Sequence, residues 1–147
     1  MKYTIFLLLL IFFQNTLIAE TTPPPKIDNR EFPKEELQKQ KQQIAQMVAQ
    51  EIARTLPQKV DNYTTLVEIQ SDKALLIYTF ELNVPSKSDA EIIKEDHSRM
   101  QRAVTQGVCQ SSKKFLSAGI NTRYIYRSAK SKKELFTFDI TKEICKL

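Results

Sequence analysis

The chain has 147 residues and a formal net charge of +5, with 41% hydrophobic and 27% charged residues. This is the composition of an ordinary globular protein, and the length predicts one domain. The positive charge is spread along the chain, which favours solubility over a dedicated polyanion binder, and two glycines are too few for a Gly-rich phosphate-binding loop.

Residues 1–19 have the three parts of a cleavable signal peptide. Lys2 supplies a short positive region, residues 5–13 are an unbroken apolar run, and Ala19 is a small residue before the expected cut. The apolar run is too short to cross a bilayer, which needs roughly 20 apolar residues. We therefore expect a periplasmic or secreted protein with no stable membrane span after cleavage; the alternative is an uncleaved N-terminal anchor.

Residues 20–33 are predicted to form a flexible leader, because three consecutive prolines favour an extended polyproline conformation. Residues 34–147 are predicted to form a single domain. Its first element is a helix over residues 34–56, with Pro33 at its start and Pro57 after its end. Ile44, Val48 and Ile52 recur every four residues and form an apolar stripe.

Two strands follow this helix. Residues 63–70 alternate between apolar and polar side chains, although Leu66 breaks the alternation. Residues 74–83 are apolar on both faces near their start, which is typical of a central strand, and Pro85 ends the run. The pair predicts an antiparallel hairpin.

A second helix is predicted from a capping box, in which Ser88 is the cap and Glu91 stands three residues later. It is expected to reach about Gln106, with a break or kink at Gly107, further helix over residues 108–118 and a stop at Gly119.

The last two strands, residues 120–127 and 134–141, predict a second hairpin around a polar turn at 128–133. The expected fold is therefore α+β in the order α-β-β-α-β-β, with a four-stranded antiparallel sheet of two hairpins packed against two main helices. Cys109 and Cys145 are the only cysteines, and an exported chain meets oxidising conditions. We predict one disulfide between them, which closes about 37 residues and contributes roughly 3–4 kcal/mol.

Residues that carry catalysis are scarce. His97 is the only histidine and lies on the apolar stripe of the second helix, which indicates a partly buried structural side chain. Two paired cysteines and one histidine have no zinc-ligand spacing. We expect no enzyme, no metal and no cofactor, although a hydrolase that uses only carboxylates is a remaining alternative. Arg123 and Arg127 alternate with Tyr124 and Tyr126, which places the tyrosines on the opposite face and argues against nucleic-acid binding.

One family resemblance rests on the C-terminal half. Its residues are Cys109, Phe115-Leu116, Gly119-Ile120, Tyr124-x-Tyr126-Arg127, Phe138-x-Ile140-Thr141 and Cys145. In this spacing the chain resembles the disulfide-containing αβ pilotins of type II secretion systems. The resemblance implies a periplasmic domain with a groove that takes an apolar helix from a secretin subunit. Pilotins are typically lipoproteins, whereas this signal peptide has no lipobox cysteine.

The sequence thus predicts a non-enzymatic periplasmic binding or assembly accessory protein with a secretin-like protein partner in the cell envelope. The expected partner-binding residues are Ile44, Val48 and Ile52 of the first helix and Leu75 and Ile77 of the second strand. The alternative is an exported inhibitor or immunity-type protein that blocks an enzyme with the loop at residues 85–88.

Overall fold

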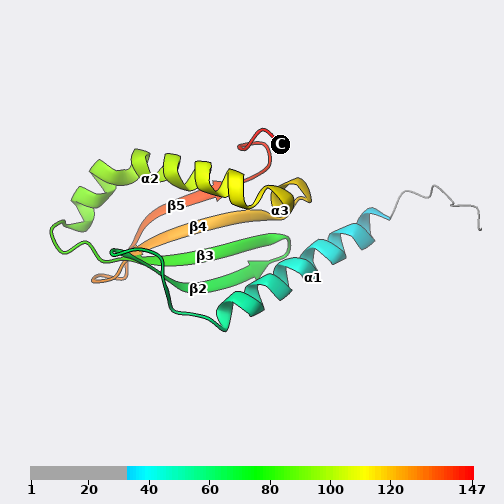
Figure 1. Ribbon diagram of the computed structural model, residues 1–147, viewed down its shortest axis with the longest axis horizontal. Coiled ribbons are helices and arrows are strands. Elements are labelled where there is room, and N and C mark those ends of the chain that lie inside the picture. Colours follow the sequence, from blue (N-terminus) through cyan, green and yellow to red (C-terminus); the bar gives the residue numbers. More distant parts are fainter. Residues whose placement is uncertain (1–32) are drawn as a thin grey trace, which may run out of the picture. The chain divides into compact units, whose positions relative to one another are not determined.

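The computed structural model describes residues 33–147. The predicted signal peptide at 1–19 and all but the last residue of the predicted leader at 20–33 lie outside the described residues. The elements are α1 (Lys34–Ala53), β1 (Gln58–Lys59), β2 (Thr64–Asp72), β3 (Leu75–Leu82), α2 (Asp89–Ser111), α3 (Lys113–Ser117), β4 (Asn121–Ser128) and β5 (Glu134–Ile140). In Figure 1, α1 runs beside β2 and α2 runs beside β5.

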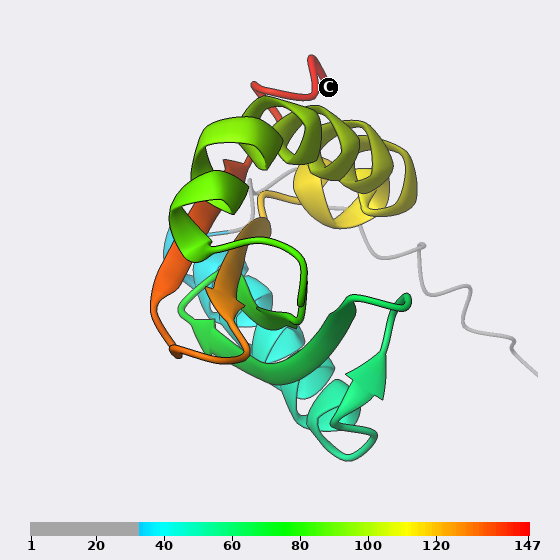
Figure 2. The ribbon, with the colours of Figure 1, turned by 90° about the vertical axis from the view of Figure 1, so that its left-hand side faces the viewer.

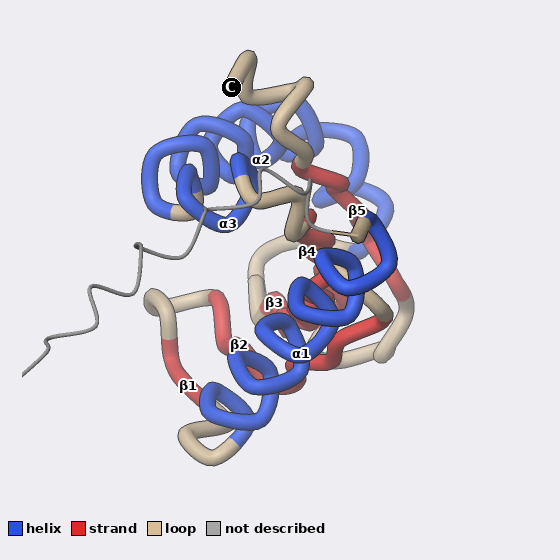
Figure 3. The backbone as a smooth tube through the Cα atoms, turned by 90° about the vertical axis from the view of Figure 1, so that its right-hand side faces the viewer, coloured by secondary structure: helices blue, strands red, loops and turns tan. Residues whose placement is uncertain are grey.

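The sheet differs from the prediction in strand number and in direction. It has five strands, which neighbour one another in chain order (Figure 3). The two predicted hairpins, β2–β3 and β4–β5, are present and antiparallel, but β3 and β4 pair in parallel, so the sheet is mixed. The cause is the crossover through α2 and α3, which returns the chain to the end of the sheet where β3 began. The additional strand is β1. It has two residues, which are too few to show an alternation pattern in the sequence.

A β-bulge in β2 explains why Leu66 breaks the alternation of the sequence. Leu66 pairs with Phe80 and Glu68 pairs with Thr79, so Val67 is an extra residue between them. The bulge shifts the inward positions of β2 by one residue, and Leu66 and Ile69 are both buried. As a result, β2 buries one even-numbered residue, Leu66, and one odd-numbered residue, Ile69.

Both long helices pack on the same face of the sheet. Alternate residues of a strand point to one face, so Leu76, Tyr78, Phe80 and Leu82 share a face of β3. Leu76 lies in a cluster with Ala45 and Ala49 of α1, and Phe80 and Leu82 lie in the cluster that contains Ile92 of α2. Seen along its strands, the sheet is strongly twisted (Figure 2). The opposite face carries no helix within residues 33–147.

The second helix follows its predicted cap but not its predicted kink. The Ser88 hydroxyl accepts a hydrogen bond from the Glu91 amide, and the Glu91 carboxylate accepts one from the Ser88 amide. The α-helix continues through Gly107 to Ser111, and the chain breaks instead at Ser112 before the short helix α3. The first helix begins after Pro33 as predicted and ends at Ala53, three residues before the predicted Leu56.

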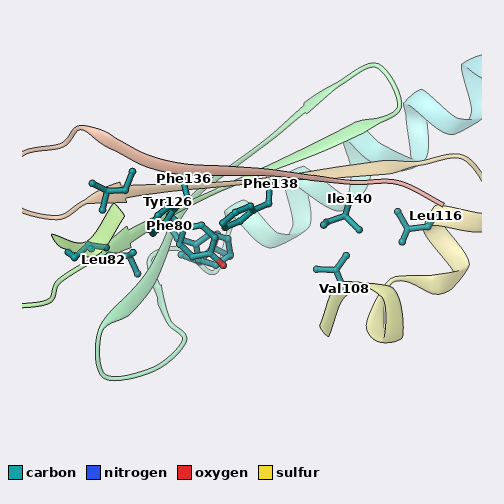
Figure 4. Packing of buried hydrophobic residues seen from close by; sticks show 11 residues of the cluster. Phe80, Leu82, Val108, Leu116, Tyr126, Phe136, Phe138 and Ile140 are labelled. Carbon is teal, nitrogen blue, oxygen red and sulfur yellow. The ribbon is translucent and has the colours of Figure 1, made fainter. Parts of the chain in front are cut away.

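The larger core cluster lies between the sheet and α2. The rings of Phe80, Tyr126, Phe136 and Phe138 lie together, whereas Val108, Leu116 and Ile140 form the other end of the cluster (Figure 4). Cys109 and Cys145 are joined by the predicted disulfide, with their Cα atoms 5.3 Å apart. The bond ties the segment after β5 to α2. Among residues 33–147, no helix is both long and apolar enough to cross a membrane.

Replacing Gly107 by alanine should stabilise the protein. Gly107 lies inside α2, and an added Cβ would meet no atom within 4 Å. Because glycine costs a helix interior up to about 1 kcal/mol relative to alanine, we expect Gly107→Ala to raise the free energy of unfolding by about that amount. Urea denaturation of the oxidised protein measures the change. A midpoint that falls would contradict this account of the site.

Removing the disulfide should destabilise the protein much more. The bond joins residues 36 apart, so the double variant Cys109→Ala/Cys145→Ala should lose about 3 kcal/mol of unfolding free energy. Urea denaturation with and without a thiol reductant measures this loss. The reductant should destabilise the wild type and leave the double variant unchanged; an equal effect on both would show that the bond does not form in solution.

Candidate partner-binding surface

Partly buried apolar side chains of both helices, of the chain after α1 and of the sheet pack on the helix side of the two core clusters, and we call this set the inter-helix surface. Each of them packs against the buried core and keeps part of its area exposed. Its members are Val48, Ile52, Leu56, Tyr78, Met100, Val104 and Tyr124. Ile52, Leu56 and Tyr78 pack against both core clusters. They therefore lie where the core cluster under α1 meets the core cluster under α2.

Stacked aromatic rings cross the β3–β4 pair beneath this surface. Tyr78 and Tyr124 are directly paired in the parallel register, and their ring centroids are 5.0 Å apart with planes at 10°. Phe80 and Tyr126 form the next pair along, at 4.9 Å. Burial raises the pKa of Tyr78 and of Tyr124, and it raises the pKa of Tyr126 to about 12. These phenols are therefore neutral at physiological pH, and the sheet presents uncharged rings to the inter-helix surface.

The structure brings together only part of the predicted binding set. Ile44, Val48 and Ile52 share one side of α1, and Val48 and Ile52 belong to the inter-helix surface, while Ile44 is 43% exposed. Leu75 and Ile77 alternate with Leu76 and therefore point to the sheet face that carries no helix. The two groups cannot line one groove. Val48 and Ile52 pack instead against the same core cluster as Tyr78, which looks like an ordinary core tyrosine in the sequence.

Three basic residues of the last hairpin, Arg123, Arg127 and Lys132, are paired with acids. Arg123 donates two hydrogen bonds to Asp139, at 2.6 Å and 3.0 Å. Arg127 and Lys132 both reach Glu81, at 2.9 Å and 2.8 Å. The hydrogen bond from Lys132 is the main cause that lowers the pKa of Glu81. As predicted, Tyr126 points to the opposite face from these arginines and is buried.

A cavity of about 310 Å³ opens beside α2, between the β1–β2 loop and the loop after β3. We call it the Asp61 pocket. Its apolar lining is Leu82, Val84, Ile92 and Met100, and its polar lining includes Asp61, Tyr63, Lys87, Asp96 and Arg99. No sequence motif points to this pocket, because its residues come from three segments: 61–64, 82–87 and 92–100.

Most charges of the Asp61 pocket are already paired. Lys87 contacts Glu95 at 3.0 Å and Asp96 at 3.1 Å, and Arg99 contacts Asp96 at 2.9 Å. The hydrogen bond from Arg99, with that from Lys87, lowers the pKa of Asp96. Asp61 is different: its Oδ1 accepts hydrogen bonds from the amides of Tyr63 and Thr64, at 2.7 Å and 2.8 Å. Within residues 33–147 Asp61 forms no ion pair.

His97 differs from its prediction as a partly buried residue. It is exposed, and its ring covers Phe136 and Phe138 with centroids 5.6 Å and 5.5 Å away. Its role in the described structure is to shield two core rings at the β5 side of α2. Across residues 33–147, no group of three or more His, Cys, Asp or Glu side chains is placed to hold a metal ion.

The chain matches a family model over residues 39–136, from within α1 to within β5. It belongs to this family, described as Domain of unknown function (DUF8479). The match covers the inter-helix surface, the Asp61 pocket and the first cysteine of the disulfide. No curated protein matches the DUF8479 chain.

Three solved structures share the fold of this DUF8479 protein. One is described as a "putative secreted protein" of Pseudomonas aeruginosa, with a TM-score of 0.64 and 13% identity, covering 74% of this chain and 96% of the other. The others are the pilotin EpsS of the Vibrio vulnificus type 2 secretion system, with a TM-score of 0.61, and the type II secretion system pilotin AspS of Vibrio cholerae, with 0.59. Each is 15% identical and covers 76% of this chain, which spans 96% and 98% of their lengths. The resemblance to αβ pilotins is thus confirmed at the level of the fold.

The buried phenol of Tyr126 should make stability depend on alkaline pH. The pKa of Tyr126 rises from 10.0 to about 12, first because of burial and second because of the negative charge of Asp61. The unfolded chain releases this proton near pH 10 and the folded protein does not, so the free energy of unfolding should fall as the pH rises from 10 towards 12. Urea denaturation at pH 9, 10 and 11 measures the slope. Tyr126→Phe should make the slope shallower; an unchanged slope would contradict the assignment.

Proposed function

We propose that this protein is an exported, non-enzymatic accessory factor that binds an apolar segment of an envelope protein across the inter-helix surface. The observation that carries the proposal is a set of partly exposed apolar side chains on the same side of the sheet, contributed by α1, by Tyr78 and Tyr124 and by α2. An apolar helix laid between two helices buries its own apolar face against such a surface.

The exposed side of α1 extends this surface outward. Ile44 is 43% exposed and Met47 is 68% exposed, although both are large apolar residues. Lys41 is three residues before Ile44 on the same side of α1, and its ammonium lies 2.9 Å from where a Cβ on Gly119 would stand. This side of α1 therefore points towards the turn between α3 and β4, and not towards the outer edge of the sheet at β1.

The shared fold supports an assembly role in the cell envelope. Two of the three structural neighbours are pilotins of type II secretion systems, and the third is described as secreted. The proposed location is the periplasm or the medium after removal of residues 1–19, and the proposed partner is a secretin-like subunit.

Site-specific photo-crosslinking tests the proposal. A photoreactive phenylalanine at Ile44 in the exported protein should trap an apolar segment of an envelope protein, which mass spectrometry of the crosslinked peptide identifies. The matched control position is Thr137, which is exposed on the open face of the sheet. Equal yields at both positions, or a yield at Thr137 only, would place binding elsewhere.

A charge on the exposed side of α1, next to the inter-helix surface, should weaken binding without unfolding the protein. Met47 is the most exposed large apolar residue of α1, so Met47→Glu should preserve the circular dichroism spectrum and reduce the Ile44 crosslink at least tenfold, or by about 1.4 kcal/mol. Gln46→Glu adds the same charge to a neighbouring exposed position of the helix. Gln46→Glu should leave the crosslink intact; if it reduces the yield as much as Met47→Glu does, the effect is electrostatic and not apolar.

A further inference from the structure

We infer that the Asp61 pocket receives an arginine or lysine side chain of the bound partner segment. The inference rests on the proposed function, because it assigns a chemical feature to the partner that the inter-helix surface binds. The pocket adjoins this surface at Met100, which belongs to both. A partner lying across the inter-helix surface therefore has the pocket within reach of its side chains.

The lining of the pocket matches a side chain with an apolar stem and a cationic head. Leu82, Val84, Ile92 and Met100 supply an apolar wall, against which methylene groups pack. Asp61 and Tyr63 stand on the side of the β1–β2 loop, and Tyr63 is 57% exposed. Arginine and lysine bury their methylenes along apolar surface while their charged ends reach polar groups, and a cation also interacts favourably with the face of a tyrosine ring.

The pairing of the charges selects a cation over an anion. Lys87 and Arg99 are held by Glu95 and Asp96 at 2.9–3.1 Å, so neither offers an unpaired positive charge to an acidic ligand. Asp61 uses Oδ1 for two backbone amides and has no cationic partner within residues 33–147. Its negative field reaches the interior, since it contributes to the raised pKa of Tyr126. An incoming guanidinium or ammonium supplies the missing partner of Asp61.

Small probes test the pocket independently of any partner. The mature protein labelled with ¹⁵N is titrated with n-butylguanidinium and with n-butylurea, which has a similar shape and no charge. We expect n-butylguanidinium to shift the amide resonances of Asp61, Tyr63, Lys87 and Met100, and n-butylurea to bind about tenfold more weakly. Valerate serves as the anionic probe. Equal affinities for n-butylguanidinium and n-butylurea, tighter binding of valerate than of n-butylguanidinium, or shifts confined to other parts of the protein would overturn the inference.

Asp61→Asn isolates the charge while preserving the loop. The asparagine carbonyl oxygen accepts the same hydrogen bonds from the amides of Tyr63 and Thr64, so the fold should be unchanged. The variant should bind n-butylguanidinium about tenfold more weakly than the wild type does. Asp72→Asn removes an equal charge at the other end of β2, where Asp72 is exposed, and should bind like the wild type. If both variants weaken binding equally, the probe senses net charge and not the pocket.

Crosslinking separates this inference from the proposed function. A photoreactive phenylalanine at Tyr63 should trap the same partner segment as one at Ile44, and Asp61→Asn should reduce the Tyr63 crosslink more than the Ile44 crosslink. A trapped segment without arginine or lysine would overturn the inference and leave the proposed function standing. Specific binding of n-butylguanidinium with no crosslink at Ile44 would instead refute the proposed function.

Discussion

The parallel pairing of β3 with β4 is the constraint on which the rest of the structure depends. It joins two hairpins that are each local in the chain, and it sets Tyr78 beside Tyr124 and Phe80 beside Tyr126. Each pair stacks with ring centroids about 5 Å apart, an arrangement worth about 0.5–1.5 kcal/mol beyond the area buried. Because α1 packs on the first hairpin and α2 on the second, this pairing also sets the distance between the helices.

The crossover between these strands explains the position of the disulfide. A parallel connection needs a long return path, and α2 with α3 supplies it. The return path packs chiefly against β5, the last strand, so the chain after β5 ends beside the helix that made the crossover possible. Cys109 and Cys145 join these two segments. The bond therefore ties the chain after β5 to the crossover helix, and its loss should weaken the packing of α2 on β5 before that of α1 on β2.

The sequence predicts the local elements well and their assembly less well. The capping box at Ser88, both hairpins and the facing of Tyr124 and Tyr126 depend on neighbours within a few residues, and these predictions are confirmed. The parallel pairing, the bulge at Val67 and the strand β1 depend on residues far apart in the chain. The same limit applies to the candidate site: Leu75 and Ile77 are as apolar as Tyr78, and only the face set by the pairing decides which of them meets α1.

The two faces of the sheet carry different kinds of side chain: ion pairs on the open face and neutral aromatic rings on the helix face. On the open face, Arg123 pairs with Asp139, and Arg127 and Lys132 both pair with Glu81. On the helix face, Tyr78 and Tyr124 remain neutral and partly buried. Charged pairs exposed to water contribute little to binding, whereas half-buried rings lose little entropy when they are covered. The proposed partner would therefore gain most free energy on the helix face, and the proposed cation contact at Asp61 would add a polar interaction there.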